Sequence, residues 1–288
     1  MKALILAAGR GKRLGETQGS ANKCMLEFEG KPVVELNIQR AAELEDVDEI
    51  VIVVGYGAED IINRYGTNYG GKRIKYVIQS EQKGLVHAIE CGRRAIGNDD
   101  FFLLLGDEVL INSRHKEMLK KFKEENLFGI CGVCNAKDGH KISKTYTVIV
   151  DDGGRVFRLI EKPRKALNGF QGTGHCIFKN DIFSYIERTP IHYERKEKEL
   201  PDLVQCAVDD GHIVKIFPVC DEYTNINTEE DLKEAEMILC PRFDIGGLLS
   251  ANGQIKLAQE AITPTIVNRD INTTPKPLIR ANVGRVTK

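Results

Sequence analysis

Short apolar runs alternate with amphipathic segments through the first half of the chain. A short apolar run bounded by turn residues predicts a buried strand, and apolar positions spaced three or four residues apart predict a helix. Their alternation is typical of βαβ units and of a mostly parallel sheet. The predicted strands are 3–7, 49–54, 74–78, 101–105, 129–133, 146–150, 174–178 and 213–218.

Three segments between these strands predict crossover helices. They are 32–45, 84–95 and 113–124. In the first, Val34, Leu36, Ile38 and the pair Ala41-Ala42 suggest a helix that buries one stripe against a sheet. The pattern therefore predicts an α/β fold in which helices flank a central sheet.

A tight turn follows the predicted strand 146–150. The sequence Asp151-Asp152-Gly153-Gly154, with Arg155-Val156-Phe157 after it, is typical of a hairpin. A hairpin joins antiparallel strands, so we expect a mixed rather than purely parallel sheet beyond its middle.

The composition changes after residue 239. Proline and glycine punctuate a stretch rich in Asn, Thr and Ile, with one helix candidate at 254–261. We therefore predict a main domain at 1–239 and an accessory segment at 240–288. That segment would be an oligomer contact or a linker, and homo-oligomerisation stays open.

Charge and hydropathy exclude several partners. The 41 Lys and Arg nearly balance the 42 Asp and Glu, so no global positive field exists to hold nucleic acid or an anionic membrane. The apolar runs are far shorter than the roughly 20 residues of a membrane span. The first run passes directly into a glycine-rich turn, unlike a signal peptide, so we expect a cytoplasmic protein.

The eight cysteines are scattered through predicted strands and helices, which favours reduced thiols. Cys131 and Cys134 have metal-ligand spacing but fall in a predicted strand, and no second such pair completes a zinc site. We interpret them as packing thiols. His140, His175 and His212 are interpreted as surface or core histidines, with His175 also a candidate for a substrate pocket.

A glycine loop follows the first predicted strand. In Gly9-Arg10-Gly11-Lys12-Arg13-Leu14-Gly15, closely spaced glycines let backbone N–H groups approach phosphate oxygens. The loop lacks the Gly-Lys-Ser/Thr ending of a Walker motif, and Leu14 stands where a dinucleotide fingerprint needs its third glycine. The loop carries the cations Arg10, Lys12 and Arg13, and Lys23 follows further along the chain. Such a group of cations suits a triphosphate.

These residues and four later motifs resemble the nucleotidyltransferases that activate sugar phosphates. The later motifs are Gln79 with Gly84-Leu85, Leu105-Gly106-Asp107, Glu161-Lys162-Pro163, and Asn225-Ile226-Asn227-Thr228-Glu229-Glu230-Asp231-Leu232. Each motif is common alone, but five motifs in this order, each placed at the end of a predicted strand, are together specific to this family. The resemblance covers residues 1–238 and implies a Rossmann-like nucleotidyltransferase fold with a mixed, mostly parallel sheet.

The resemblance implies transfer of a nucleotidyl group from a nucleoside triphosphate to a phosphorylated small molecule, with release of pyrophosphate. In such a reaction the protein aligns two polyanions and neutralises charge, so cations matter more than a base. Arg13 would contact the β- and γ-phosphates, Lys23 the α-phosphate, and Lys162 the acceptor phosphate. We expect these three to be the catalytic residues.

The nucleotide and metal contacts are carried over in the same way. The nucleotide would be held by Leu6, Ala7, Ala8, Gly9, Gly11, Gln79, Gly84 and Asp107. Gln79 and Gly84 match the positions that read a pyrimidine in relatives using UTP, dTTP or CTP. Asp107 follows a buried strand and would bind Mg²⁺, which prefers oxygen ligands. Asn225 or Asn227 would supply the second ligand.

The acceptor pocket follows the family least closely. Its predicted residues are Tyr146, Glu161, Lys162, Thr173 and His175. Thr147 stands where sugar-specific members have a Gly, and Glu108 stands where they have an Asn. The loop at 15–22 is also shorter than the corresponding loop of those members. These departures resemble enzymes that activate phosphocholine, polyol phosphates or phosphonates, so the acceptor stays open between these and a sugar 1-phosphate.

Two other classes of function remain. A regulatory or nucleotide-binding module could keep the fold without turnover, although Arg13, Lys23 and Asp107 are all present. A dinucleotide-dependent oxidoreductase is disfavoured by Leu14 and by the crowded cations.

Overall fold

A computed structural model describes residues 1–9, 22–28, 30–136, 138–227 and 229–239. The described residues belong to one compact unit. The predicted accessory segment at 240–288 lies outside the described residues, as do Gly11 and Arg13, so the predicted domain boundary stays a prediction. No helix of the described residues is long and apolar enough to cross a membrane.

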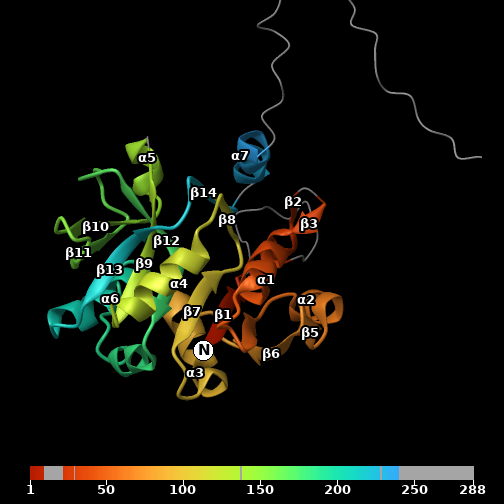
Figure 1. Cartoon of the computed structure of the whole chain (residues 1–288). Helices are drawn as coiled ribbons and strands as arrows, with labels where there is room; N and C mark the ends of the chain where they lie inside the picture. The colour runs from red at the N-terminus through yellow and green to blue at the C-terminus, as the bar shows by residue number, and fades with distance from the viewer. Residues whose placement is uncertain (10–21, 29, 137, 228, 240–288) are drawn as a thin grey trace, which may run out of the picture. The chain divides into compact units, whose positions relative to one another are not determined.

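The central sheet has eight strands in the order β13-β9-β12-β7-β1-β4-β6-β5 (Figure 1). Their bounds are β1 Lys2–Ala7, β4 Glu49–Val54, β5 Asn68–Tyr69, β6 Lys72–Ile78, β7 Phe101–Leu105, β9 Gly129–Asn135, β12 Phe170–Phe178 and β13 Val214–Pro218. β1 pairs in parallel with β4 and β7, and β6 extends this parallel set. β12 is antiparallel to β7 and β9. The prediction of a mixed, mostly parallel sheet is therefore confirmed.

The predicted hairpin forms, but it is not the cause of the mixed sheet. β10 (Tyr146–Val150) and β11 (Val156–Glu161) pair with each other in a separate two-stranded sheet. The backbone N–H of Gly154 donates to Asp151 O, and the positive φ of 77° at Gly154 suits glycine. Two further small sheets pair β2 (Glu27–Phe28) with β3 (Lys31–Pro32), and β8 (Glu108–Ile111) with β14 (Glu222–Asn225).

Helices cover both faces of the central sheet (Figure 1). Their bounds are α1 Val33–Glu43, α2 Ala58–Tyr65, α3 Leu85–Ile96, α4 His115–Glu124, α5 Gly139–Ile142, α6 Leu200–Asp209 and α7 Glu229–Leu239, with short 3-10 helices at η2 (Lys23–Met25) and η3 (Asn180–Tyr185). The predicted crossover helices correspond to α1, α3 and α4. The sequence did not predict α2 or α6.

Alternate residues of the strands point into two hydrophobic clusters. Leu4 and Leu6 of β1 pack with residues of α3 and α6. Ala3 and Ile5 pack on the other face with residues of α1, α2 and α4. This period-two alternation of a strand buried on both faces explains why β7 is apolar throughout and why β1 and β4 are apolar after their first residues, Lys2 and Glu49.

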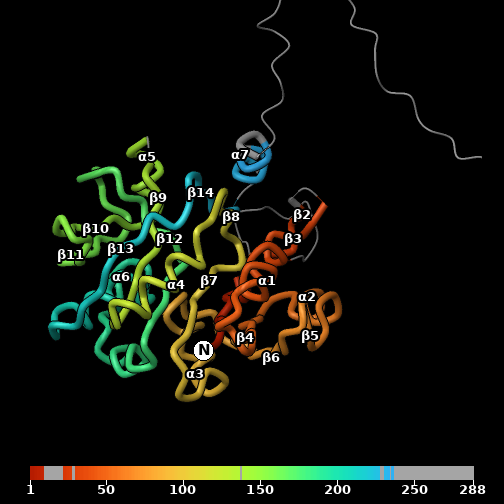
Figure 2. The backbone as a smooth tube through the Cα atoms, viewed as in Figure 1, coloured from red at the N-terminus to blue at the C-terminus, as the bar shows by residue number. Residues whose placement is uncertain are grey.

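The parallel strands all end at the same edge of the sheet. The chain leaves β1, β4, β6 and β7 there (Figure 2). In open α/β sheets this edge is where ligands bind. The fold thus brings the loops that follow four strands to one place.

Candidate active site

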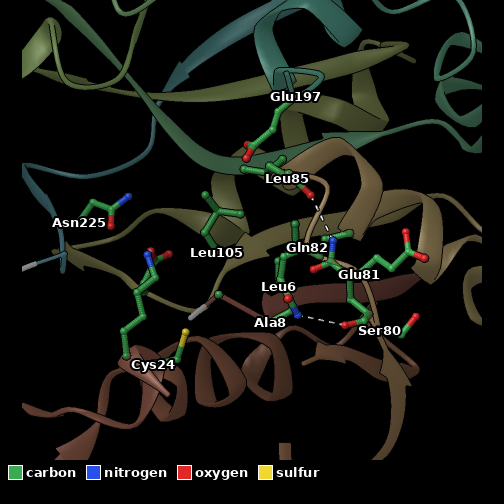
Figure 3. A pocket seen from close by; sticks show the side chains of 16 residues that line it. Leu6, Ala8, Cys24, Ser80, Glu81, Gln82, Leu85, Leu105, Glu197 and Asn225 are labelled. Carbon is green, nitrogen blue, oxygen red and sulfur yellow. Dashed lines mark hydrogen bonds and ion pairs between the residues drawn. The ribbon is translucent and has the colours of Figure 1, made fainter. Parts of the chain in front are cut away.

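A cleft of about 770 Å³ lies at this edge (Figure 3). Its lining comes from the ends of β1, β6 and β7, from the start of α3, and from the segments around η2, Glu197 and β14. The lining residues are Leu6, Ala8, Gly9, Lys23, Cys24, Gln79, Ser80, Glu81, Gln82, Gly84, Leu85, Ala88, Leu105, Asp107, Glu197 and Asn225. Half of these were predicted site residues, which the fold collects from distant parts of the chain.

One wall is the end of β1 and the segment that crosses it. A Cβ on Gly9 would lie 3.3 Å from Lys23 Cε, so the lysine side chain runs closely over this glycine. Asn22 holds this crossing in place. Its buried amide donates to Ala7 O at 2.6 Å and to Tyr56 O at 2.8 Å, and its Oδ1 accepts from Cys24 N. Sequence reasoning missed Asn22, because only the fold shows which carbonyls it reaches.

Lys23 and Asp107 form an ion pair at one end of the cleft. Lys23 Nζ also donates to Asn227 Oδ1 at 3.3 Å. Burial alone would lower the pKa of Lys23, but the Asp107 carboxylate, together with Cys24 and Glu108, raises this pKa above its ordinary value. The lysine therefore stays a cation at neutral pH, beside a carboxylate and an amide oxygen.

Hydrogen bonds to α1 and β1 hold the turn that carries Asp107. Asn37 of α1 is fully buried, and its Nδ2 donates to Leu105 O at 2.9 Å and Glu108 O at 3.0 Å. Gly106 N donates to Leu6 O at 2.9 Å, which continues the ladder between β1 and β7. Asn37 was also missed by sequence reasoning, because it looks like one polar position of an amphipathic helix.

Glu108 points away from the cleft into the core. Its carboxylate accepts hydrogen bonds from Gly174 N and from the Tyr223 hydroxyl at 2.8 Å. Burial, and then the neighbouring Asp107 carboxylate, raise the pKa of Glu108 to about 8. The departure from the family pattern at Glu108 thus joins β8, β12 and β14 behind the site.

Oxygen atoms that suit a divalent cation gather around Asp107. Asn225 at the end of β14 lies opposite Glu108 in the β8–β14 pairing, and Ile226 N donates to Asp107 O at 2.8 Å. Asn227 Nδ2 lies 3.2 Å from Asn225 Oδ1. One carboxylate and two amide oxygens are the hard ligands that Mg²⁺ prefers. Among the residues that the structure describes, no group of three His, Cys, Asp or Glu side chains could hold a metal.

The other end of the cleft is shaped by Gln79 and Gly84. Gln79 follows β6, and its Nε2 donates to Gly84 O at 3.2 Å and lies 2.9 Å from His87 Nδ1. Gly84 has a φ of 95°, and a Cβ there would lie 2.8 Å from the Glu197 carboxylate. Both geometry and space therefore require glycine at this position.

Glu197 was not predicted, yet it lies on the far wall of the cleft near Leu85 (Figure 3). It belongs to a run of alternating charges, 195–199, which in the sequence is typical of a solvated loop. In the same run, Arg195 pairs with Glu199, and its Nη2 is enclosed without a hydrogen-bond partner among the described residues.

Glu161 and Lys162 lie at the end of β11. Lys162 has a φ of 43°, its N–H donates to Thr145 O at 2.6 Å, and its Nζ lies 3.1 Å from Glu161 Oε1. Burial is the main reason why the pKa of Glu161 is raised. Neither residue lines the 770 Å³ cleft. Their role toward an acceptor stays a prediction.

Three other predicted acceptor residues are buried. Tyr146 donates its hydroxyl to Thr173 O at 3.0 Å, and Thr173 Oγ1 donates to Gly132 O at 3.1 Å. His175 is fully enclosed and lies 2.8 Å from His115 Nε2 through its Nδ1. The structure does not bring these side chains into the cleft lining. Tyr146 and Thr173 lie in the core between β9, β12 and the hairpin, and His175 lies against His115 of α4.

The two spaced cysteines belong to the core. Cys131 and Cys134 both lie in β9 and are buried, and they pack into clusters on opposite faces of the sheet. This placement agrees with the interpretation as packing thiols.

Curated relatives cover most of the chain. A UTP–glucose-1-phosphate uridylyltransferase, AglF of Haloferax volcanii, is 30% identical over 239 residues, which are 83% of this chain and 96% of that protein. The low-salt glycan biosynthesis nucleotidyltransferase Agl11 of the same organism is 29% identical over 271 residues, 91% of this chain and 74% of that protein. A glucose-1-phosphate thymidylyltransferase of Streptomyces griseus is 25% identical over 303 aligned residues.

Solved structures share the fold. A UDP-glucose pyrophosphorylase complexed with UDP-glucose matches with a TM-score of 0.72 at 22% identity, over 83% of this chain and 97% of that one. The inositol-1-phosphate CTP transferase of T. maritima matches with a TM-score of 0.63 at 24% identity, over 80% and 90%. The predicted Rossmann-like nucleotidyltransferase fold is therefore confirmed.

The family follows from the sequence over nearly the whole described unit. Residues 2–237 match the model of the nucleotidyl transferase family. With the relatives above, this match confirms the resemblance that the glycine loop and the four later motifs indicated. The chain belongs to the nucleotidyl transferase family and is a nucleotidyltransferase.

Proposed function

We propose that this enzyme transfers a nucleotidyl group from a pyrimidine nucleoside triphosphate to the phosphate of a sugar 1-phosphate. The observation that carries this proposal is the cleft itself, which holds the Lys23–Asp107 pair at one end and Gln79 at the other. A cation and metal-type oxygens suit the phosphates, and an amide at the far end suits the base.

The proposed reaction needs no protein nucleophile. An oxygen of the acceptor phosphate attacks the α-phosphorus of the nucleotide, the bond to the bridging oxygen breaks, and pyrophosphate leaves with the electron pair. Lys23 would contact the α-phosphate and stabilise charge that grows during transfer. Arg13, for which we propose the β- and γ-phosphates, lies outside the described residues.

We propose that Asp107, with Asn225 or Asn227, holds Mg²⁺ beside the phosphates. When bound, the ion would neutralise phosphate charge and orient the leaving group. The donor set supports this proposal, because Asp107 and Asn225 line the same end of the cleft and Asn227 contacts both Lys23 and Asn225. A single carboxylate suits an ion that takes its other ligands from phosphates and water.

For the acceptor we propose Lys162 as the phosphate contact and Glu161 as the partner of its hydroxyls. Three predicted acceptor residues would act indirectly, by holding the strands near Glu161 and Lys162 in place. These residues are Tyr146, Thr173 and His175. A sugar 1-phosphate is favoured over phosphocholine or a phosphonate because the relatives named above are sugar nucleotidyltransferases. A cytoplasmic location and a homo-oligomer stay predictions.

The experiment is a pyrophosphate-release assay with Mg²⁺. It crosses UTP, dTTP, CTP, ATP and GTP with sugar 1-phosphates, inositol 1-phosphate, phosphocholine and a small phosphonate. We expect release only when a pyrimidine nucleotide and a sugar 1-phosphate are both present. Asp107→Asn, which keeps the shape of the side chain, should lower kcat by at least about 100-fold.

Release with a purine nucleotide, or with inositol 1-phosphate, phosphocholine or the phosphonate as acceptor, would contradict the proposal, and so would two further results. One is the absence of release for every pair while a nucleotide still binds, which would indicate a binding module. The other is a wild-type rate in Asp107→Asn, which would remove the metal assignment.

A further inference from the structure

The amide of Gln79 is held by two groups of the protein at the base end of the cleft. Gln79 is 4% exposed and lines the cleft directly after β6. Its Nε2 lies 3.2 Å from Gly84 O and 2.9 Å from His87 Nδ1. His87 belongs to the first turn of α3, so the helix whose start lines the cleft also holds the amide of Gln79.

The chemistry of these partners fixes which way the amide faces. A backbone carbonyl can only accept a hydrogen bond, so the group that faces Gly84 O must be the NH₂ of Gln79. His87 Nδ1 then also accepts from this NH₂, and the proton of the neutral imidazole lies on Nε2. His87 Nε2 is 3.8 Å from Cys91 Sγ, a weak acceptor.

The group that remains for a ligand is the amide oxygen. Both hydrogens of the Gln79 NH₂ are used within the protein, and Oε1 accepts no hydrogen bond from the residues that the structure describes. Oε1 is not enclosed by the protein, because the buried polar atoms that lack a hydrogen-bond partner do not include it. The start of α3 lines the same cleft, and its first N–H groups have no side-chain cap and, as in any helix, no intrahelical partner. The cleft therefore presents an acceptor beside donors.

We infer that His87 is a positioning residue that makes this cleft select uracil or thymine over cytosine. The inference rests on the proposed function. Uracil and thymine carry an N3–H donor between two carbonyl oxygens, which complements an acceptor beside donors. Cytosine carries an N3 acceptor and an amino group, so its N3 would face Gln79 Oε1 with no proton between them.

Rotating the amide would not rescue cytosine. A rotated Gln79 would direct its oxygen at Gly84 O, and two acceptors would again face each other. His87 adds to this penalty, because its Nδ1 lone pair would face the same oxygen unless the proton moved from Nε2 to Nδ1, which gives the less stable tautomer of a neutral imidazole. Without His87, one of the two groups that hold the amide is lost, and the amide can turn more easily.

The test compares nucleotides that differ only at these positions. The kcat/KM values for UTP, dTTP and CTP are measured with one acceptor, and UTP and CTP binding is measured by calorimetry without acceptor. We expect wild type to prefer UTP or dTTP to CTP by at least about 100-fold in kcat/KM. In His87→Leu, this preference should fall at least about 10-fold. In His87→Gln, whose amide oxygen can accept the same hydrogen bond, part of it should return.

His140→Leu is the matched control, since His140 is an exposed histidine of α5. It should keep the wild-type preference. A merely structural role of His87 would lower the values for both nucleotides equally and leave their ratio unchanged, which would overturn the inference. Equal or better use of CTP by wild type would also overturn it. If no nucleotide is turned over, the proposed function fails, but the calorimetric preference still decides the inference.

Discussion

At the scale of residues, the site combines side chains that the sequence identifies with side chains that only the fold reveals. Gln79 and Asp107 follow β6 and β7, Lys23 begins η2, and the cleft collects all three from recognisable motifs. Asn22 and Asn37 carry no motif. Their amides bind backbone carbonyls 15 to 71 residues away in the chain, so their roles depend on the tertiary structure.

At the scale of residues, we predict the effect of replacing Lys162, the proposed contact to the acceptor phosphate. Lys162→Ala removes the proposed contact to the acceptor phosphate, and a charged hydrogen bond is worth about 1.5–3 kcal/mol. We therefore expect the KM for the sugar 1-phosphate to rise, or kcat to fall, by about 10- to 100-fold, while the Kd of the nucleotide stays within about twofold. Steady-state kinetics and calorimetry measure the two effects.

Lys165→Ala is its control, because Lys165 is an exposed lysine of the same loop. An equal loss of nucleotide affinity in Lys162→Ala would contradict the assigned role.

At the scale of elements, apolar runs predicted the eight long strands well, and β4, β7 and β10 begin and end as expected. The elements that were missed have physical reasons. β8 and β14 have four residues each and pair only with each other, too short a pattern to detect. α6 begins with Leu200-Pro201, and a proline in the first turn resembles a break in the sequence.

These short strands matter because the turn between β7 and β8 carries Asp107. Asn37→Leu would leave Leu105 O and Glu108 O without their hydrogen bonds to α1. We expect the Tm to fall, because unsatisfied buried carbonyls cost about 1–3 kcal/mol each. We also expect the Mg²⁺ concentration for half-maximal activity to rise at least about fivefold, because the turn no longer fixes Asp107.

Gln39→Leu on the partly exposed side of α1 serves as control. A lower Tm with an unchanged Mg²⁺ dependence would show that Asn37 is structural only.

At the scale of the whole molecule, the two hydrophobic clusters enclose a polar chain between His115 and Glu108. His115 contacts His175, and His175 Nε2 lies 3.5 Å from Glu108 Oε2. Sequence analysis predicted that His175 is either a core histidine or a pocket residue, and the fold places it in the core. The sequence alone could not decide this, because β12 is buried over most of its length.

This burial predicts acid sensitivity. Burial lowers the pKa of His115 to about 3, and that of His175 also lies well below its usual range. Both are neutral in the folded state but take up protons in the unfolded state below about pH 6.5. Their contribution to stability is therefore complete above pH 6.5 and is lost as the pH falls toward 3. Each histidine should lower the free energy of unfolding by up to about 1.4 kcal/mol per pH unit, and Glu108, whose pKa is raised to about 8 in the folded state, opposes one of these contributions.

Urea unfolding between pH 7 and 5 measures this slope. His115→Gln should reduce the slope, and exposed His212→Gln should not. An identical slope in wild type and His115→Gln would contradict the prediction.

The central claim is transfer between two substrates in one cleft, and ³¹P NMR of a single reaction tests it most directly. With UTP or dTTP, a sugar 1-phosphate and Mg²⁺, we predict that a nucleotide diphosphate sugar and pyrophosphate appear in equal amounts as both substrates disappear. Hydrolysis of the nucleotide without incorporation of the sugar phosphate, or no reaction while the nucleotide is bound, would contradict the claim.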